Sequence, residues 1–258
     1  MAIIICIANQ KGGVGKTTTA VNLAASLAAA EKRTLLVDID PQGNAGSGVG
    51  IDKSSLIESI YDVLINDAAP SEVIIKTDLP ALHILPSTPD LAGAELELVS
   101  APGRERKLRD ALATVDGSYD YILIDCPPSL NLLTVNALTA ARSVLVPIQC
   151  EFYAIEGLSQ ILKTIRLIQK GLNPGLSIAG ILLTMFDARN NLSRQVSEEI
   201  RNHFPRETFE TVIPRNVRLS EAPSHGKPII LYDIASRGAT SYLELARELM
   251  QRDRGADG

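Results

Sequence analysis

The fold is decided by the stretch Ile3-Ile4-Ile5-Cys6-Ile7-Ala8-Asn9-Gln10-Lys11-Gly12-Gly13-Val14-Gly15-Lys16-Thr17-Thr18. Its first five residues form an apolar run, and an alanine-rich helical stretch follows from Thr19 to Ala30. A glycine-rich loop between a strand and a helix is a setting in which proteins bind phosphate. The glycines let backbone N–H groups point inward, and the helix adds the partial positive charge of its N-terminus. We therefore expect a phosphate-binding loop.

Two side chains at the end of this loop have the chemistry that a nucleotide requires. Lys16 can reach the β- and γ-phosphates, and the Thr17 hydroxyl is placed to ligate Mg²⁺. The loop residues expected to bind nucleotide are Lys11, Gly12, Gly13, Val14, Gly15, Lys16, Thr17 and Thr18.

One position departs from the ordinary G-x-x-x-x-G-K-[ST] pattern, because Gln10 stands where that pattern has glycine, and Lys11 is an additional lysine. The loop K-G-G-V-G-K-T resembles the deviant Walker A group, K-G-G-x-G-K-[ST], whose members include the ParA/Soj partition ATPases, MinD and the nitrogenase iron protein. The resemblance implies that Lys11 acts across a dimer interface, on nucleotide bound to the partner subunit. The alternative is a solvated loop lysine.

Composition indicates an ordinary globular protein. Of the 258 residues, 45% are hydrophobic and 21% are charged, which predicts a sizeable core. The three cysteines, Cys6, Cys126 and Cys150, show no metal-ligand spacing and are expected to be buried free thiols. A polar loop by residue 9 argues against a signal peptide, and no apolar run has membrane-spanning length. The net charge of −5 disfavours nucleic-acid binding by the whole surface.

Short apolar runs alternate with helical stretches along the chain, which predicts an α/β fold. Together with the phosphate loop, this pattern predicts a P-loop NTPase with a parallel sheet and helices on both faces. We expect a single domain over 1–258, with a flexible tail at 252–258. The strands are expected at 3–7, 33–38, 82–86, 121–125, 143–148 and 178–185, with a short late one at 212–214. Helices are expected at 56–65, 91–115 (broken near 101–103), 154–170 and 239–252.

Aspartates at two strand ends predict a hydrolase site. Asp125 ends a buried strand, where a Walker B aspartate supports Mg²⁺, usually through water. In Asp38-x-Asp40-Pro41-Gln42-Gly43-Asn44, a carboxylate beside the γ-phosphate could orient the attacking water. ParA-like proteins show this D-x-D-P-Q-G-N run, and the resemblance assigns that role to Asp40 and a supporting place near the metal to Asp38. Thr17, Asp40 and Asp125 are the expected metal residues, with Lys11, Lys16 and Asp40 catalytic.

The segment Asp125-Cys126-Pro127-Pro128-Ser129 resembles the switch II region of the same group, so Asp125 is also expected to be a switch residue. Pro127 and Pro128 restrict the backbone to few conformations, which suits a loop that responds to the γ-phosphate. The two prolines can equally serve only to stop a strand.

Two C-terminal segments, residues 183–189 and 214–226, closely resemble chromosomal ParA/Soj proteins. The resemblance implies that Pro214 and Asn216 pack on adenine, and that Arg189 and Arg218 contribute to sequence-independent DNA binding. Residues 180–258 carry ten arginines and one lysine, and arginine pairs well with phosphate. For any single arginine, the alternative is a solvated surface charge.

The resemblance implies a partition ATPase that uses ATP and Mg²⁺. ATP would join two protomers into a homodimer that binds double-stranded DNA non-specifically, and hydrolysis, stimulated by a ParB-like partner, would release it. Such a protein acts on a chromosome or a plasmid and is expected in the cytoplasm, on the nucleoid, without stable membrane association.

Three other functions use a similar phosphate loop or nucleotide switch. A MinD-like membrane ATPase needs a basic amphipathic C-terminal helix, whereas the end of this chain lacks an apolar face of adequate length. A nitrogenase-type reductase needs thiolates from exposed loops, and Cys126 is the only plausible candidate. A regulator of replication initiation switched by ATP stays open as an additional role.

Overall fold

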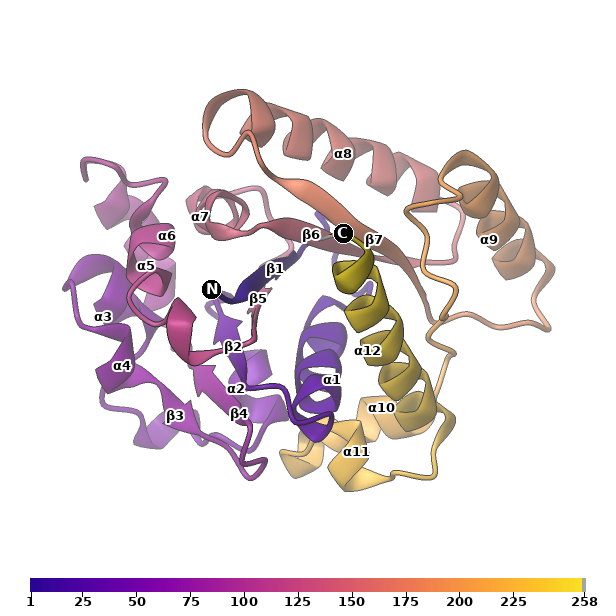
Figure 1. Cartoon of the computed structure of the whole chain (residues 1–258), viewed down its shortest axis with the longest axis horizontal. Helices are drawn as coiled ribbons and strands as arrows, with labels where there is room; N and C mark the ends of the chain where they lie inside the picture. The colour runs from indigo at the N-terminus through magenta and orange to yellow at the C-terminus, as the bar shows by residue number, and fades with distance from the viewer. Residues whose placement is uncertain (257–258) are drawn as a thin grey trace.

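A mostly parallel sheet runs through the centre of the molecule (Figure 1). The computed structural model describes residues 1–256. The strand order is β3-β4-β2-β5-β1-β6-β7, and only the short pairing of β3 with β4 is antiparallel. The strands are β1 (Ile3–Ile7), β2 (Thr34–Asp38), β3 (Ile75–Lys76), β4 (Leu82–Leu85), β5 (Tyr121–Asp125), β6 (Ser143–Gln149) and β7 (Ser177–Thr184).

Helices cover both faces of this sheet, as predicted (Figure 1). The α-helices are α1 (Lys16–Ala29), α2 (Asn44–Gly48), α3 (Ile60–Ile65), α4 (Pro70–Val73), α5 (Leu91–Leu98), α6 (Lys107–Leu112), α7 (Leu132–Ala140), α8 (Ala154–Gly171), α9 (Asn191–His203), α10 (Val217–Glu221), α11 (Ile229–Tyr232) and α12 (Arg237–Ala256). Short 3₁₀ turns are η1 (Lys53–Ser55), η2 (Asp116–Ser118) and η3 (Ala222–His225).

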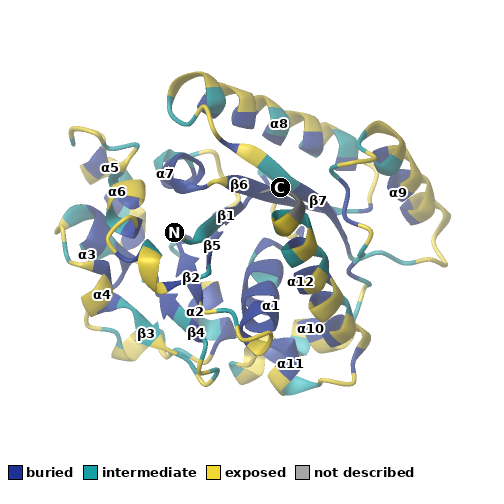
Figure 2. Cartoon of the chain, in the orientation of Figure 1, coloured by how far each residue is buried: buried dark blue, intermediate teal, exposed yellow. Residues whose placement is uncertain are grey.

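Two hydrophobic cores lie on opposite faces of the sheet, because successive strand residues point to opposite sides. In β1, Ile5 and Ile7 belong to the core shared with α1 and α12, whereas Cys6 belongs to the core shared with α7 and α8. All strands except β3 are almost wholly buried in their central parts (Figure 2). Burial on both faces explains why the strands read as continuous apolar runs in the sequence.

The topology places the loop after β1 at a crevice. The chain passes from β1 to β2 and β4 on one side, and later to β6 and β7 on the other. Ligands of open α/β sheets bind outside the carboxyl ends of the strands at such a change of direction.

Several expected boundaries were wrong. The expected helix at 56–65 begins only at Ile60, because Ser59 and Asp62 form a capping box there. The expected late strand at 212–214 is absent; the structure has only an isolated bridge between Phe186 and Pro214. The short β3, α7 and α9 were not predicted, since their apolar patterns are short or mixed with polar residues.

The expected flexible tail at 252–258 is helical as far as Ala256. Arg252 donates to the backbone oxygens of Glu207 and Thr208, and the Tyr121 hydroxyl donates to Asp253 at 2.9 Å. These contacts with distant segments hold the last turns against the sheet. Residues 257 and 258 lie outside the described part of the chain.

Candidate active site

The glycine-rich loop is held in place by side chains at its two ends. Asn9 donates to the backbone oxygen of Pro147 at the β6 strand (2.8 Å) and accepts from the Lys11 N–H (3.0 Å). Thr184, at the end of β7, donates to the backbone oxygen of Val14 at 2.9 Å. Hydrogen bonds to β6 and β7 thus fix the position of the loop, which we call the cradle.

Two glycines in the loop have backbones that other residues rarely adopt. Gly13 has φ of 74° and Gly15 has φ of 85°, both in the left-handed region. This turn leads directly into α1, whose N-terminus faces the cradle. Nothing lies within 4 Å of where a side chain on Gly12 or Gly13 would begin, so the cradle is open on that side.

Gln10, which stands where the ordinary loop pattern has glycine, makes a contact outside the loop. Its side-chain amide donates to the Thr164 hydroxyl on α8 at 2.9 Å. The head of the loop is therefore linked to α8. This contact was not predicted, because nothing in the sequence pairs residues so far apart.

The two loop lysines differ in environment. Lys16 is buried, and its Nζ donates to the backbone oxygen of Lys11 at 3.1 Å. Burial lowers the pKa of Lys16, while the nearby carboxylate of Asp125 acts in the opposite direction. Lys11 is partly exposed, and its Nζ lies 3.5 Å from the Glu151 carboxylate. Lys11 can thus exchange one anionic partner for another.

Asp38 and Asp125 lie opposite each other in register at the carboxyl ends of β2 and β5. Asp38 accepts hydrogen bonds from the N–H groups of Asp40 (3.2 Å) and Gly46 (3.1 Å). Burial raises the pKa of Asp38 to about 7. Asp38 therefore organises the segment that carries Asp40, whose own Oδ1 accepts from the Gln42 N–H at 3.0 Å.

Asp125 is fully buried, and its carboxylate oxygens lack a hydrogen bond of normal geometry, although the Thr17 side chain lies close enough to favour the ionised carboxylate. Burial and, next, the charge of Asp38 raise its pKa well above the usual range. Orphaned buried carboxylate oxygens are costly unless something outside the chain satisfies them. A hydrated Mg²⁺ supplies both positive charge and donor water. With Thr17 and Asp40 nearby, the residues fit this ion.

Among residues 1–256, no group of three His, Cys, Asp or Glu side chains could hold a metal alone.

A hollow of about 390 Å³ joins these groups. Its walls include Gly12, Lys16, Asp40 and Pro128, which brings the loop, the D-x-D segment and the switch segment together. Gln42, Asn44 and Met185 also line it and were not assigned roles from the sequence. Pro127 is buried, whereas Pro128 is exposed to the hollow.

A second hollow of about 320 Å³ adjoins the first, sharing Gly15, Thr18 and Met185 with it. Pro214 and Asn216 line it, as do Arg215 and Tyr242. Asn216 caps α10 by accepting from the Arg218 N–H at 2.8 Å. The volume and the mixed apolar and polar lining suit a purine base, and Tyr242 comes from α12, far away in sequence.

The two arginines expected to bind DNA are exposed near this C-terminal region. Arg189 is 92% exposed and pairs with Asp187 at 3.1 Å. Arg218 pairs with Glu221 at 2.9 Å and with Asp233 at 3.4 Å. Each arginine therefore already has a carboxylate partner, at a position open to solvent.

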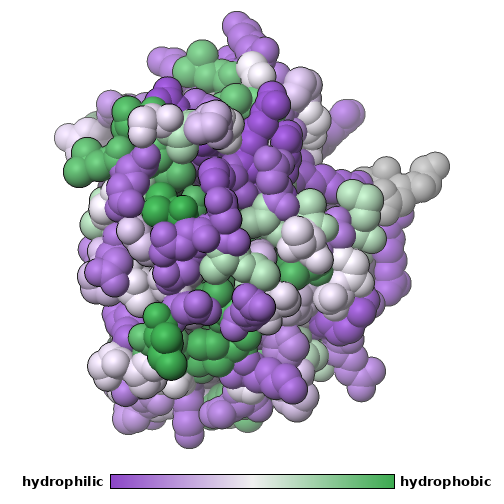
Figure 3. All heavy atoms as spheres, turned by 90° about the vertical axis from the view of Figure 1, so that its left-hand side faces the viewer, coloured by the Kyte–Doolittle hydropathy of each residue, from purple (hydrophilic) through white to green (hydrophobic). Residues whose placement is uncertain are grey.

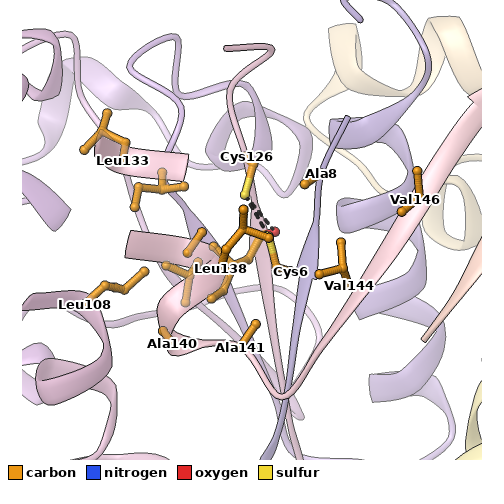
Figure 4. Close-up of a cluster of buried hydrophobic side chains, with 14 of the residues drawn as sticks. Cys6, Ala8, Leu108, Cys126, Leu133, Leu138, Ala140, Ala141, Val144 and Val146 are labelled. Carbon is orange, nitrogen blue, oxygen red and sulfur yellow. Dashed lines mark hydrogen bonds between the residues drawn. The ribbon is translucent and has the colours of Figure 1, made fainter. Parts of the chain in front are cut away.

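The cysteines are buried free thiols, as predicted. Cys6 and Cys126 face each other with their sulfurs 3.1 Å apart, among apolar side chains such as Leu138 (Figure 4). Burial raises the pKa of Cys126 well above its usual range. Cys126 is therefore a core residue and is not presented on an exposed loop, as a cluster-binding reductase would need.

Comparison with known proteins agrees with this site. The AAA domain family matches residues 2–178. The chain is 64% identical to the chromosome partitioning protein ParA of Myxococcus xanthus, over 97% of this chain and 88% of that one. It is 61% identical to the sporulation initiation inhibitor protein Soj of Bacillus subtilis, over 96% and 98%.

Among solved structures, the chain is similar to a Mycobacterium smegmatis protein named cobyrinic acid a,c-diamide synthase, with bound ATP analogue and magnesium. The TM-score is 0.87 and the identity 39%, over 99% of this chain and 97% of that one. Sequence and fold agree over nearly the full length of these proteins. The chain therefore belongs to the ParA/Soj family of chromosome-partitioning P-loop ATPases.

Proposed function

We propose that this protein is a Mg²⁺-dependent ATPase that partitions DNA: ATP joins two copies into a dimer that binds DNA without sequence preference, and hydrolysis ends the attachment. The observation that carries the proposal is the fully buried carboxylate of Asp125, which lacks a hydrogen bond of normal geometry and lies close to Lys16 and Asp40, two residues that line the hollow of about 390 Å³. The names of the relatives, ParA and Soj, support a role in partitioning.

In this mechanism the protein's groups act mainly by positioning. The loop N–H groups and Lys16 hold the phosphates, Thr17 would ligate the ion, and Asp125 would hold its water. When bound, Mg²⁺ would supply positive charge that offsets the charge of the nucleotide phosphates. Lys16 gives up its contact with the Lys11 backbone oxygen to reach the nucleotide.

Asp40 orients the attacking water. Its carboxylate, fixed by the Gln42 N–H, lines the same hollow as Lys16. The water oxygen forms a bond to the γ-phosphorus while the bond to the β-bridging oxygen breaks, yielding ADP and phosphate. Positioning a water in this way needs a carboxylate that is held in place. Asp38 helps to hold Asp40, because its carboxylate accepts from the Asp40 N–H.

Features around Lys11 support a homodimer. Lys11 has only a weak, partly exposed partner in Glu151, and Gly12 beside it faces open space. Two exposed aromatic residues follow Glu151: Phe152 is 74% exposed and Tyr153 is 61% exposed. Exposed apolar side chains at the rim of a nucleotide site suit a partner that covers it. In the dimer, Lys11 would leave Glu151 for the phosphates bound to the partner subunit.

DNA binding is assigned to Arg189 and Arg218. Both can exchange a carboxylate for a phosphate, and a dimer presents two copies of each, which strengthens a weak contact. Through this contact the protein would be located on the nucleoid in the cytoplasm. A ParB-like partner would complete or rigidify the site and speed hydrolysis.

The MinD-like alternative is not favoured. Among the described residues, no helix is both long and apolar enough to traverse a bilayer. The apolar side of α12, including Tyr242, Leu245 and Leu249, is buried in the core shared with α1. That side is therefore unavailable to lie on a lipid surface.

A DNA-binding titration tests the proposal. Binding to random-sequence duplexes is measured without nucleotide and with ADP, ATP and a non-hydrolysable ATP analogue, at two salt concentrations. We expect tight, salt-sensitive binding with ATP and the analogue only. Equal binding in all four states would reject the ATP-controlled attachment, and binding to anionic vesicles in place of DNA would favour the MinD-like function.

A further inference from the structure

Gln10 stands at the position where the ordinary phosphate loop has its first glycine, and its side chain reaches out of the loop. Its amide donates to the hydroxyl of Thr164 on α8 at 2.9 Å, and the two residues are 154 positions apart in the sequence. We propose that this contact, which we call the anchor, positions Lys11 for the nucleotide bound to the partner subunit. Gln10 and Thr164 are then positioning residues of the ATPase reaction. The inference rests on the proposed function, because it takes the role of Lys11 in the dimer from there.

Thr164 is the polar exception on the buried side of α8. The other buried residues of this helix are apolar, namely Ala154, Leu158, Ile161, Ile165 and Ile168. Thr164 is 5% exposed, and its hydroxyl donates to the backbone oxygen of Gln160 at 3.3 Å while it accepts from Gln10. Packing alone needs no polar atom at this position, since valine has nearly the same shape. The contact with Gln10 therefore accounts for the hydroxyl.

The backbone of Lys11 is held at both of its polar groups. Its N–H donates to Oδ1 of Asn9 at 3.0 Å, and its oxygen accepts from Nζ of Lys16 at 3.1 Å. The second contact is given up when Lys16 turns to the nucleotide in the proposed mechanism. Two links then hold the head of the loop, one from Asn9 to β6 and the other from Gln10 to α8. The anchor is thus needed most when nucleotide is bound.

Helix α8 also connects the anchor to the surface that a second copy would cover. Directly before this helix stand Glu151, whose carboxylate lies 3.5 Å from the Lys11 Nζ, and the exposed Phe152 and Tyr153. The Ala154 N–H donates to the Glu151 oxygen at 2.9 Å, so this segment continues into the first turn of the helix. The head of the loop therefore contacts α8 at its middle, through Gln10, and just before its start, through Lys11.

Other exposed apolar side chains lie on a different side of the molecule. Figure 3 faces the side formed by α3 to α6 and shows apolar residues among hydrophilic ones. Leu96, which is 81% exposed, belongs to α5 of this side. The side chains of Gln10 and Lys11 contact Thr164 and Glu151 instead. We therefore expect the second copy on the α8 side of the loop, where the anchor acts.

Amide hydrogen exchange of the nucleotide-free chain tests the anchor itself. Thr164→Val removes the hydroxyl and keeps the shape, whereas Thr164→Ser keeps the hydroxyl. Protection of residues 9–16 should fall roughly three- to tenfold in Thr164→Val and in Gln10→Ala, the contribution of one uncharged hydrogen bond, and should stay at the wild-type level in Thr164→Ser. Thr139→Val is the matched control, because Thr139 is buried on α7 and donates to the Val135 oxygen. Unchanged protection in Thr164→Val would overturn the inference.

The consequence for the reaction is measured as turnover at saturating ATP and as the protein concentration at which an ATP analogue produces the dimer. Gln10→Ala and Thr164→Val should each lower turnover and raise that concentration roughly three- to tenfold. Analogue affinity of the dilute monomer should not change, because Lys11 acts on the nucleotide of the partner subunit. In a Lys11→Ala background neither change should have a further effect, since the lysine that the anchor positions is absent.

The outcomes separate the anchor from the proposed function. If Lys11→Ala hydrolyses ATP and dimerises like wild type, the role of Lys11 across the dimer fails and positioning fails with it, while the exchange result on the anchor stands. If Lys11→Ala is impaired but Gln10→Ala and Thr164→Val are not, neither residue positions the lysine, and the proposed function is untouched. Losses that add to those of Lys11→Ala, together with a lower free energy of unfolding in urea, would show a purely structural contact and overturn the inference.

Discussion

Lys16 is a buried cation that the protein holds on a backbone oxygen, and that arrangement leaves it ready for an anionic ligand. Removing its side chain by Lys16→Ala should weaken binding of a non-hydrolysable ATP analogue by about a hundredfold or more. The reason is that hydrogen bonds to charged groups contribute roughly 1.5–3 kcal/mol each, and about 1.4 kcal/mol is tenfold. Isothermal titration calorimetry with Mg²⁺ measures this. Lys170→Ala, an exposed change on α8, is the control, and normal affinity in Lys16→Ala would contradict the phosphate-loop assignment.

Asp40 differs from Lys16 because its role concerns water and not affinity. Asp40→Ala should reduce turnover by roughly 10²–10⁴-fold, the usual contribution of a positioned acid–base group, while nucleotide binding persists. Phosphate release and nucleotide affinity, measured on the same preparation, separate the two effects. The exposed Asp90→Ala variant should behave as wild type. Undiminished turnover in Asp40→Ala would reject the water-positioning role.

At the scale of elements, α12 is held by Glu248, which accepts from the N–H groups of Glu210 (2.8 Å) and Thr211 (2.9 Å). Burial alone would raise the pKa of Glu248, but these donors and Arg252 outweigh it and lower the pKa. A carboxylate with a lowered folded-state pKa stabilises the fold above its unfolded pKa, about 4.3, and this contribution disappears as the pH falls through the folded value.

Glu248→Gln should therefore lower the free energy of unfolding at pH 7 by about 1–2 kcal/mol, a modest figure because the site is partly screened by solvent. The difference from wild type should shrink below about pH 4. Urea unfolding at neutral pH and at a pH below the unfolded pKa measures both values, and Glu244→Gln, exposed on the same helix, is the control. A difference that is independent of pH would show that the charge of Glu248 is not what matters.

At the scale of the whole molecule, Gly12 tests the dimer. A side chain there meets nothing within 4 Å in the protomer, so Gly12→Val should fold and bind nucleotide. It should nevertheless stay monomeric with an ATP analogue, because the added bulk lies where the second copy would approach. Light scattering coupled to gel filtration gives the mass. Gly117→Val also places its side chain in open space and should still dimerise; an ATP-bound dimer of Gly12→Val would refute this geometry.

The DNA-binding surface is also a property of the whole molecule. Arg189→Glu should weaken binding to all duplex sequences, and the slope of log K against log salt should become shallower by about one for each phosphate that the variant no longer binds. ATP affinity should not change. Arg109→Glu provides a matched control, since Arg109 is likewise exposed and paired with a nearby aspartate, Asp110. If both variants bind DNA like wild type, the basic surface lies elsewhere.

Much of the fold could be predicted because the strands are buried on both faces and therefore read as apolar runs. Residues 3–7 and 121–125 were predicted with the bounds that the structure has. The short β3 was missed, because two residues carry no periodic pattern. The error at the C-terminus has a different cause: the turns around Arg252 are held by residues remote in sequence, since the Arg252 side chain donates to the backbone oxygens of Glu207 and Thr208.

By itself the sequence determined the phosphate loop, the aspartates at two strand ends and the class of fold, since each depends on residues close together in the chain. Only the tertiary structure decided how these groups act on one another. Strand register sets the two buried aspartates Asp38 and Asp125 opposite each other, and α12 brings Tyr242 to the second hollow. Local patterns specify chemistry, whereas burial and contact between distant segments determine where that chemistry is used.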